Sequence, residues 1–185
     1  MKRSFARSPY LWAAFGAVAI VVIAWLGRES YRPVLTGREA PDFTATTLDG
    51  QEVSLTDFED RVVLVNIWAT WCGPCREEMP SMQRLYDAFR GDDFEILAVS
   101  VDARIGERDP SGNPGGNLRA FADEFGLTFP ILHDPAGDIQ RIYQTTGVPE
   151  TFLIGRDGII YKKVAGGTHW DDPVNTGLVR RLLDG

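Results

Sequence analysis

The sequence predicts an α/β domain built on a mixed β-sheet, and three observations lead to this fold class. Apolar, strand-like runs alternate with segments of helical periodicity along most of the chain. Asp49-Gly50 and Asp157-Gly158 mark tight turns of the kind that join antiparallel strands. The chain has 185 residues, of which 44% are hydrophobic, and this is enough for the core of one domain with an appendage.

The first half of the domain is expected to hold a hairpin, two buried strands and a helix. Ala40–Leu55 alternates in polarity around Asp49-Gly50, which predicts a β-hairpin. Val62–Trp68 reads VVLVNIW, a continuous apolar run typical of a strand that is buried on both faces. A helix is expected over Pro74–Arg90, and a second buried strand over Phe94–Val101.

The second half begins with a long loop, Asp102–Gly116, which is rich in proline and glycine. The spacing of apolar residues predicts a helix over Leu118–Phe125. The remaining elements follow in the order strand, helix, hairpin and helix: Phe129–Leu132, Asp138–Tyr143, Thr151–Ile154 with Ile159–Ala165, and a last helix that begins at Asp172-Pro173.

The N-terminus resembles a membrane anchor. Residues 10–26 carry no charge and are just long enough for a helix to span a bilayer, which takes ~17–25 residues. Lys2, Arg3 and Arg7 precede this run, so the tail should stay cytoplasmic and the remainder be exported. We expect a tail (1–9), a transmembrane signal anchor (10–27), a linker (28–39) and a domain (40–185). The alternatives are a cleaved signal peptide, although residues 24–28 offer no good cleavage site, and a buried core helix.

The charge of the chain argues against nucleic acid as a partner. The net charge is -7, and without the three basic residues of the tail 16 basic residues stand against 26 acidic ones. An acidic surface repels a phosphate backbone.

Both cysteines of the chain lie in WATWCGPCREEMP, where a predicted strand ends and a predicted helix begins. Zinc would need about four ligands, and only His133 and His169 could supplement the two thiols. A structural disulfide between Cys72 and Cys75 would close a very short loop, which contributes little stability. Dithiol chemistry is the third interpretation, and it fits the position best.

At the start of a helix, free N–H groups and the helix dipole favour a thiolate on Cys72. Cys75 follows one turn later and can resolve a mixed disulfide formed on Cys72. Gly73 is expected to let the chain turn closely, and Pro74 suits the first helical turn because its missing N–H is not needed there.

The helix also indicates a third functional residue, Glu78. At ~100° per residue, Glu78 falls in the apolar arc that contains Leu85 and Phe89. A carboxyl group buried one turn from Cys75 should have a raised pKa and could exchange protons with that cysteine. The alternative is that Glu78 turns outward to solvent, as most glutamates do.

The motifs together point to a family. WCGPC followed by Pro80 resembles thioredoxin, and omission of about residues 103–132 leaves the thioredoxin order of elements. APDF, NIWATWCGPCREEMP, GVPETFLI and the N-terminal anchor resemble the membrane-anchored thiol–disulfide oxidoreductases of the TlpA/ResA/CcmG group. The resemblance covers about Ala40–Leu183. It implies a thioredoxin-like fold with an N-terminal β-hairpin and a central helix–strand insertion.

The resemblance also implies roles for single residues. Cys72 would attack, Cys75 would resolve, and Glu78 matches an acidic residue near the active site. Pro149 matches the family's cis-proline, which faces the cysteine pair, and Val148 would offer backbone hydrogen bonds to a bound strand. The substrate-binding residues expected on this basis are Trp71, Gly73, Pro74, Val148 and Pro149. No metal and no cofactor beyond a redox-active Cys72–Cys75 disulfide is expected.

Two features bear on the direction of the reaction. Asn66 replaces the buried aspartate of thioredoxin, which leaves Glu78 as the candidate proton acceptor. If the Gly73-Pro74 pair sets the redox potential of the two cysteines, that potential lies nearer thioredoxin's ~-270 mV than the ~-120 mV of a strong oxidant. The protein would then reduce disulfides on the periplasmic side of a bacterial inner membrane, and a membrane electron carrier would re-reduce it.

By resemblance, the expected partners are exported proteins: apocytochrome c, whose haem-binding cysteines must be free, or copper-site assembly proteins. Two other functions remain open. A peroxiredoxin-like enzyme would carry P-x-x-x-T-x-x-C, but here Thr70 is one residue too close to Cys72 and the proline is missing. A non-catalytic anchored binding or chaperone module would keep its activity in Cys72→Ser.

Overall fold

The structure is a computed structural model that describes residues 9–26 and 34–185. It contains two compact units, Met1–Pro33 and Val34–Gly185. In the first unit, α1 (Pro9–Leu26) is a helix where the uncharged run predicted one. No helix among the described residues is long and apolar enough to qualify as a membrane span, so the anchor stays a prediction. Residues 1–8 and 28–33, assigned to the tail and the linker, lie outside the described residues.

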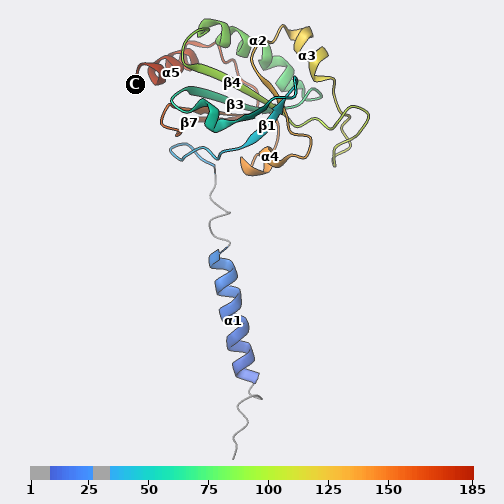
Figure 1. Cartoon of the computed structure of the whole chain (residues 1–185), viewed down its shortest axis with the longest axis vertical. Coiled ribbons are helices and arrows are strands. Elements are labelled where there is room, and N and C mark those ends of the chain that lie inside the picture. Colours follow the sequence, from blue (N-terminus) through green and yellow to red (C-terminus); the bar gives the residue numbers. More distant parts are fainter. Residues whose placement is uncertain (1–8, 27–33) are drawn as a thin grey trace, which may run out of the picture. The chain divides into compact units, whose positions relative to one another are not determined.

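The second unit is organised around a seven-stranded mixed sheet (Figure 1). The strand order is β2-β1-β5-β4-β3-β6-β7, with parallel pairing of β3 with β4 and of β4 with β5 and antiparallel pairing elsewhere. The strands are β1 (Thr44–Thr47), β2 (Glu52–Ser54), β3 (Val62–Trp68), β4 (Phe94–Ser100), β5 (Ile131–His133), β6 (Glu150–Ile154) and β7 (Ile160–Ala165). The predicted α/β class with a mixed sheet is confirmed.

Helices cover both faces of this sheet. They are η3 (Leu55–Phe58), α2 (Gly73–Ala88), α3 (Leu118–Phe125), α4 (Asp138–Ile142) and α5 (Pro173–Asp184). Apolar residues of α2, α3 and α5 form one buried cluster with Leu64 and Trp68 of β3. Ile139 of α4 joins the other cluster, with Val63 and Val65. β3 is therefore buried on both faces, as its continuous apolar run predicted.

The inserted unit, α3 and β5, completes the sheet on one side. β5 pairs with β4 through Ala98↔Ile131 and with β1 through Thr46↔His133. It therefore connects the N-terminal hairpin to the central strands. β5 begins two residues later than predicted, because Pro130 has no N–H to donate to a neighbouring strand.

Two further details differ from the expectation. The short helix η3 follows the hairpin and was not predicted. Residues 34–39, expected in the linker, pack on the domain: Val34 is buried, and Gly37 donates its N–H to the carbonyl of Ile160 at 2.8 Å.

Candidate active site

The cysteine pair lies between the end of β3 and the first turn of α2. Cys72 is the N-cap of α2, with an extended backbone, and Pro74 stands in the first helical turn. The N–H of Cys75 points at the sulfur of Cys72, with the two atoms 3.2 Å apart. A helix N-terminus whose free N–H groups face a sulfur stabilises negative charge on it. The predicted position of Cys72 at the start of the helix is confirmed.

The two cysteines form a disulfide in this structure, so it represents the oxidised protein. Cys72 retains 5% of its surface exposed, and Cys75 is fully buried. Cys72 is therefore the slightly more exposed of the two residues. In the part of the chain that the structure describes, no group of His, Cys, Asp or Glu side chains is arranged to hold a metal ion.

Val148 and Pro149 lie against the disulfide, although they are more than seventy positions away in sequence. The Val148–Pro149 peptide bond is cis, as the resemblance implies. The carbonyl oxygen of Val148 is 3.5 Å from the sulfur of Cys72. Pro149 also accepts a hydrogen bond from the N–H of Gly166 at 2.8 Å, which ties this turn to the end of β7. This hydrogen bond anchors the backbone that lies next to Cys72.

The other residues assigned to substrate binding lie at the surface around Cys72. Trp71 is 38% exposed, and Gly73 and Pro74 are exposed as well. The expectation that Gly73 permits a close turn is wrong, because a Cβ atom there would meet nothing within 4 Å. The close approach occurs instead at Gly167, where a Cβ would lie 3.0 Å from the carbonyl oxygen of Pro74.

Glu78 faces the interior, as the helical spacing predicted, and only 2% of its surface is exposed. Its Oε1 accepts from Asn66 Nδ2 at 2.8 Å, and its Oε2 accepts from the N–H of Thr168 at 3.2 Å. Burial raises the pKa of Glu78 from 4.5 to about 7, against the lowering effect of these hydrogen bonds. The indole of Trp170 also lowers this pKa, although its Nε1–H lacks a hydrogen bond of ordinary geometry within the described structure.

A second buried acid, Asp102, holds the turn that precedes Cys72, and the sequence analysis did not identify it. Its carboxyl group accepts from Thr70 N at 2.8 Å, from Thr70 Oγ1 at 2.5 Å, from Ser100 Oγ at 2.8 Å and from Gly116 N at 3.2 Å. The carboxyl group thus joins the active-site turn to both ends of the long loop after β4. The only sequence signal was an acid directly at the end of a buried strand.

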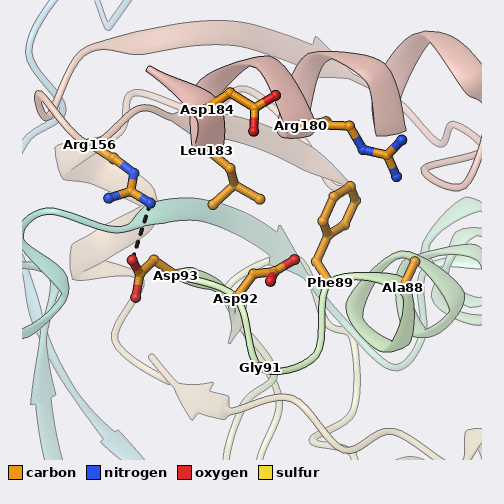
Figure 2. Close-up of a pocket in the computed structure, with 9 residues that line it drawn as sticks. All are labelled: Ala88, Phe89, Gly91, Asp92, Asp93, Arg156, Arg180, Leu183 and Asp184. Atoms are coloured by element: carbon orange, nitrogen blue, oxygen red, sulfur yellow. Dashed lines mark hydrogen bonds and ion pairs between the residues drawn. The ribbon is translucent and has the colours of Figure 1, made fainter.

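A cavity lies away from the cysteines, at the C-terminal end of α2. It has a volume of about 430 Å³ and is lined by Phe89, Arg180 and Asp184, among other residues (Figure 2). Arg156 and Asp93, which form an ion pair at 3.1 Å, lie at one side of it. Since α2 has 16 residues, the length of the helix, ~24 Å at ~1.5 Å per residue, separates this cavity from Cys72.

Comparison with known proteins agrees with this geometry. The model of the AhpC/TSA family matches residues 36–163, which is more than half of the chain. The chain belongs to this family. It is 37% identical over 168 residues to the thiol-disulfide oxidoreductase ResA of Geobacillus thermodenitrificans, a match that covers 87% of this chain and 90% of ResA. The thioredoxin-like protein YneN of Bacillus subtilis is 36% identical over 157 residues, with 80% and 86% covered.

Solved structures of similar proteins have the same fold. A protein of Chlorobium tepidum assigned as a thiol:disulfide interchange protein DsbE superposes with a TM-score of 0.65 at 29% identity, covering 80% of this chain and 95% of that one. A protein of Bacteroides thetaiotaomicron assigned as a protein disulfide isomerase gives a TM-score of 0.70 at 28% identity, with 82% and 92% covered. The protein is thus a thioredoxin-like thiol–disulfide oxidoreductase.

Proposed function

We propose that the protein reduces disulfides of exported proteins through Cys72 and Cys75. The observation that carries this proposal is the position of the Cys72 sulfur. It caps α2, faces the N–H of Cys75 at 3.2 Å and lies 3.5 Å from the Val148 carbonyl. A sulfur in this position is stabilised as a thiolate once the disulfide is reduced, and it lies beside backbone that a client strand can contact.

The reaction consists of two exchanges. In the first, the Cys72 thiolate attacks one sulfur of a client disulfide, that bond breaks, and the released client thiolate takes up a proton. In the second, Cys75 loses its proton and attacks the Cys72 sulfur, which releases the second client thiolate. The client gains two electrons from the enzyme and two protons, one matching the proton that Cys75 gives up and one from solvent, and the enzyme is left with the Cys72–Cys75 disulfide.

Glu78 is the proposed acceptor of the Cys75 proton. It lies one helical turn from Cys75 on the buried face of α2. A carboxyl group with a pKa of about 7 can both accept and release a proton near neutral pH, whereas an ordinary glutamate stays ionised. No cofactor takes part in either step.

The uncharged run at residues 10–26 and the basic residues before it support a single-pass anchor, with the domain on the periplasmic side of a bacterial inner membrane. In that compartment a dithiol does not persist unless it is re-reduced. A membrane-bound dithiol electron carrier would therefore return two electrons to the disulfide. The proposed client is apocytochrome c, and copper-site assembly proteins are the alternative.

Substitution of the resolving cysteine tests this function. In Cys75→Ser the mixed disulfide cannot be resolved, so full-length protein isolated from membranes should carry client proteins on Cys72. These adducts should disappear on reduction and be absent from the double variant that also contains Cys72→Ser. Mass spectrometry identifies them. A Cys75→Ser protein that carries no cysteine-linked protein would contradict the client role.

A further inference from the structure

Asn66 lies opposite Glu78 on β3 and is fully buried. It points to the same side of the sheet as α2, because strand residues alternate and its neighbours Leu64 and Trp68 pack there. Its Nδ2 donates two hydrogen bonds of 2.8 Å, one to Glu78 Oε1 and one to Thr151 Oγ1. Its Oδ1 has no hydrogen-bond partner within the described structure. An unpaired buried acceptor is unfavourable, so the two hydrogen bonds of Nδ2 hold the amide in this orientation.

The observed orientation suits an ionised Glu78. A carboxylate can only accept hydrogen bonds, and here each oxygen faces a donor, Asn66 Nδ2 or the N–H of Thr168. A protonated Glu78 has an O–H that must donate instead. The N–H of Thr168 belongs to the backbone and cannot become an acceptor, so the proton has to point toward Asn66.

The side-chain amide of Asn66 can offer an acceptor for this proton if it rotates by half a turn. A half-turn about the terminal side-chain bond exchanges Nδ2 with Oδ1 and requires no extra space. Oδ1 would then accept from the O–H of Glu78. Thr151 can follow, because a hydroxyl both donates and accepts, and its O–H would turn to donate to Oδ1.

We propose that Asn66 is a positioning residue whose side-chain amide reverses when Glu78 gains or loses its proton. Each state of Glu78 then keeps a hydrogen bond to β3, and the buried acid can change charge without losing its partner. The inference builds on the proton-acceptor role proposed for Glu78, but it requires only that Glu78 titrates.

Other titratable groups around Glu78 are engaged elsewhere. Cys75, on the same helix, is in the disulfide. Lys162 of β7 donates to Asn175 at 2.5 Å and lies 5.7 Å from the centre of the Trp170 ring. Asp171, in the segment after β7, pairs with Arg84 at 2.6 Å, which is the main cause of its lowered pKa, and His169 in that segment has a smaller effect in the same direction. The causes that shift the pKa of Glu78 include no charged side chain.

Nuclear magnetic resonance can follow both partners in the full-length oxidised protein in detergent. The probes are the side-chain ¹H–¹⁵N signals of Asn66, assigned through their loss in Asn66→Leu, and the ¹³C signal of the Glu78 carboxyl group. Between pH 5 and 9 we expect both to titrate with one common midpoint. In Glu78→Gln, the pH-dependent change at Asn66 should disappear.

Asn175 is the internal control. It is also buried, but both polar atoms of its amide are hydrogen-bonded. Its Nδ2 donates to the carbonyl of His169 at 2.7 Å, and its Oδ1 accepts from Lys162 at 2.5 Å. Its side-chain signals should be unaffected by Glu78→Gln. In Asn66→Leu the midpoint of Glu78 should rise by about one pH unit, because the charged form loses the stronger hydrogen bond.

Three results would overturn the proposal: Asn66 signals that stay constant while Glu78 titrates, Asn66 signals that still titrate in Glu78→Gln, or a Glu78 that does not titrate between pH 5 and 9. Failure of the proton-acceptor role is a separate outcome. It would appear as a Glu78→Gln protein that resolves mixed disulfides as fast as the wild type, whatever the Asn66 signals do.

Discussion

Replacement of Glu78 by Gln should change how the stability of the protein depends on pH. Burial raises the pKa of the Glu78 carboxyl group from 4.5 to about 7 in the folded, oxidised protein. Below pH 4.5 both the folded and the unfolded forms hold this proton. Between pH 4.5 and 7 the unfolded form releases it while the folded form keeps it, so the free energy of unfolding falls as the pH rises. Above pH 7 both forms are ionised and the loss is complete.

At ~1.4 kcal/mol per pKa unit, this loss amounts to about 3 kcal/mol. Glutamine has nearly the same shape but does not titrate, so Glu78→Gln should lack this component. The difference in free energy of unfolding between wild type and variant should therefore change by about 3 kcal/mol from pH 4.5 to pH 8, in favour of the variant. Contributions of other titrating groups are common to both proteins and cancel.

Urea unfolding of the full-length oxidised proteins in detergent, at half-unit pH intervals, measures this difference. A thermal series at the same pH values would check that both proteins unfold in one transition. If the two stability curves run parallel from pH 4.5 to pH 8, Glu78 is not a buried weak acid. The argument for its proton-acceptor role would then lose its basis.

Three further predictions concern the turn before Cys72 and the choice of substrate. Gly116→Ala should destabilise the protein by about 1–3 kcal/mol, because a Cβ there would overlap Thr70 Oγ1 and lie 2.8 Å from Asp102 Oδ1. The matched control is Gly147→Ala, where a Cβ meets nothing within 4 Å, and equal urea midpoints for the two variants would contradict this. Asp102→Ala should lower stability by on the order of 3 kcal/mol, since it leaves one buried and two partly buried donors without this acceptor; a loss below ~1 kcal/mol would mean that water replaces the carboxyl group. In assays with matched reductant, the protein should reduce insulin disulfides faster than it consumes hydrogen peroxide, and the reverse ranking would favour a peroxiredoxin-like function.

Much of the fold could be predicted because its central strands are buried on both faces and its longer helices are amphipathic. β3 and β4 are continuous hydrophobic runs bounded by polar residues, and the structure places them within one residue of the prediction. The sequence pattern could not show which strands are neighbours. β5 is only three residues long, and its place between β4 and β1 depends on pairing between distant segments.

The candidate site was predictable where one helix carries its residues. Cys72, Cys75 and Glu78 lie on or next to α2, so a period of 3.6 residues fixes their relative positions. Asp102 and Thr168 come from separate loops, and nothing local marks them as partners of the active-site turn and of Glu78. Such contacts are set by tertiary packing, which a periodic pattern does not encode.

The burial of Glu78 is explained by the proton transfer proposed for Cys75 and not by the stability of the fold. A leucine at this position would fit the surrounding apolar cluster and avoid a charge whose burial lowers stability by about 3 kcal/mol above pH 7. The chain instead surrounds the carboxyl group with donors from β3 and from the segment after β7. These donors limit the rise in pKa without cancelling it, so the group remains close to half-protonated at neutral pH. If Glu78 serves Cys75 as proposed, the unfavourable burial is also what allows it to take a proton in one exchange and return it before the next.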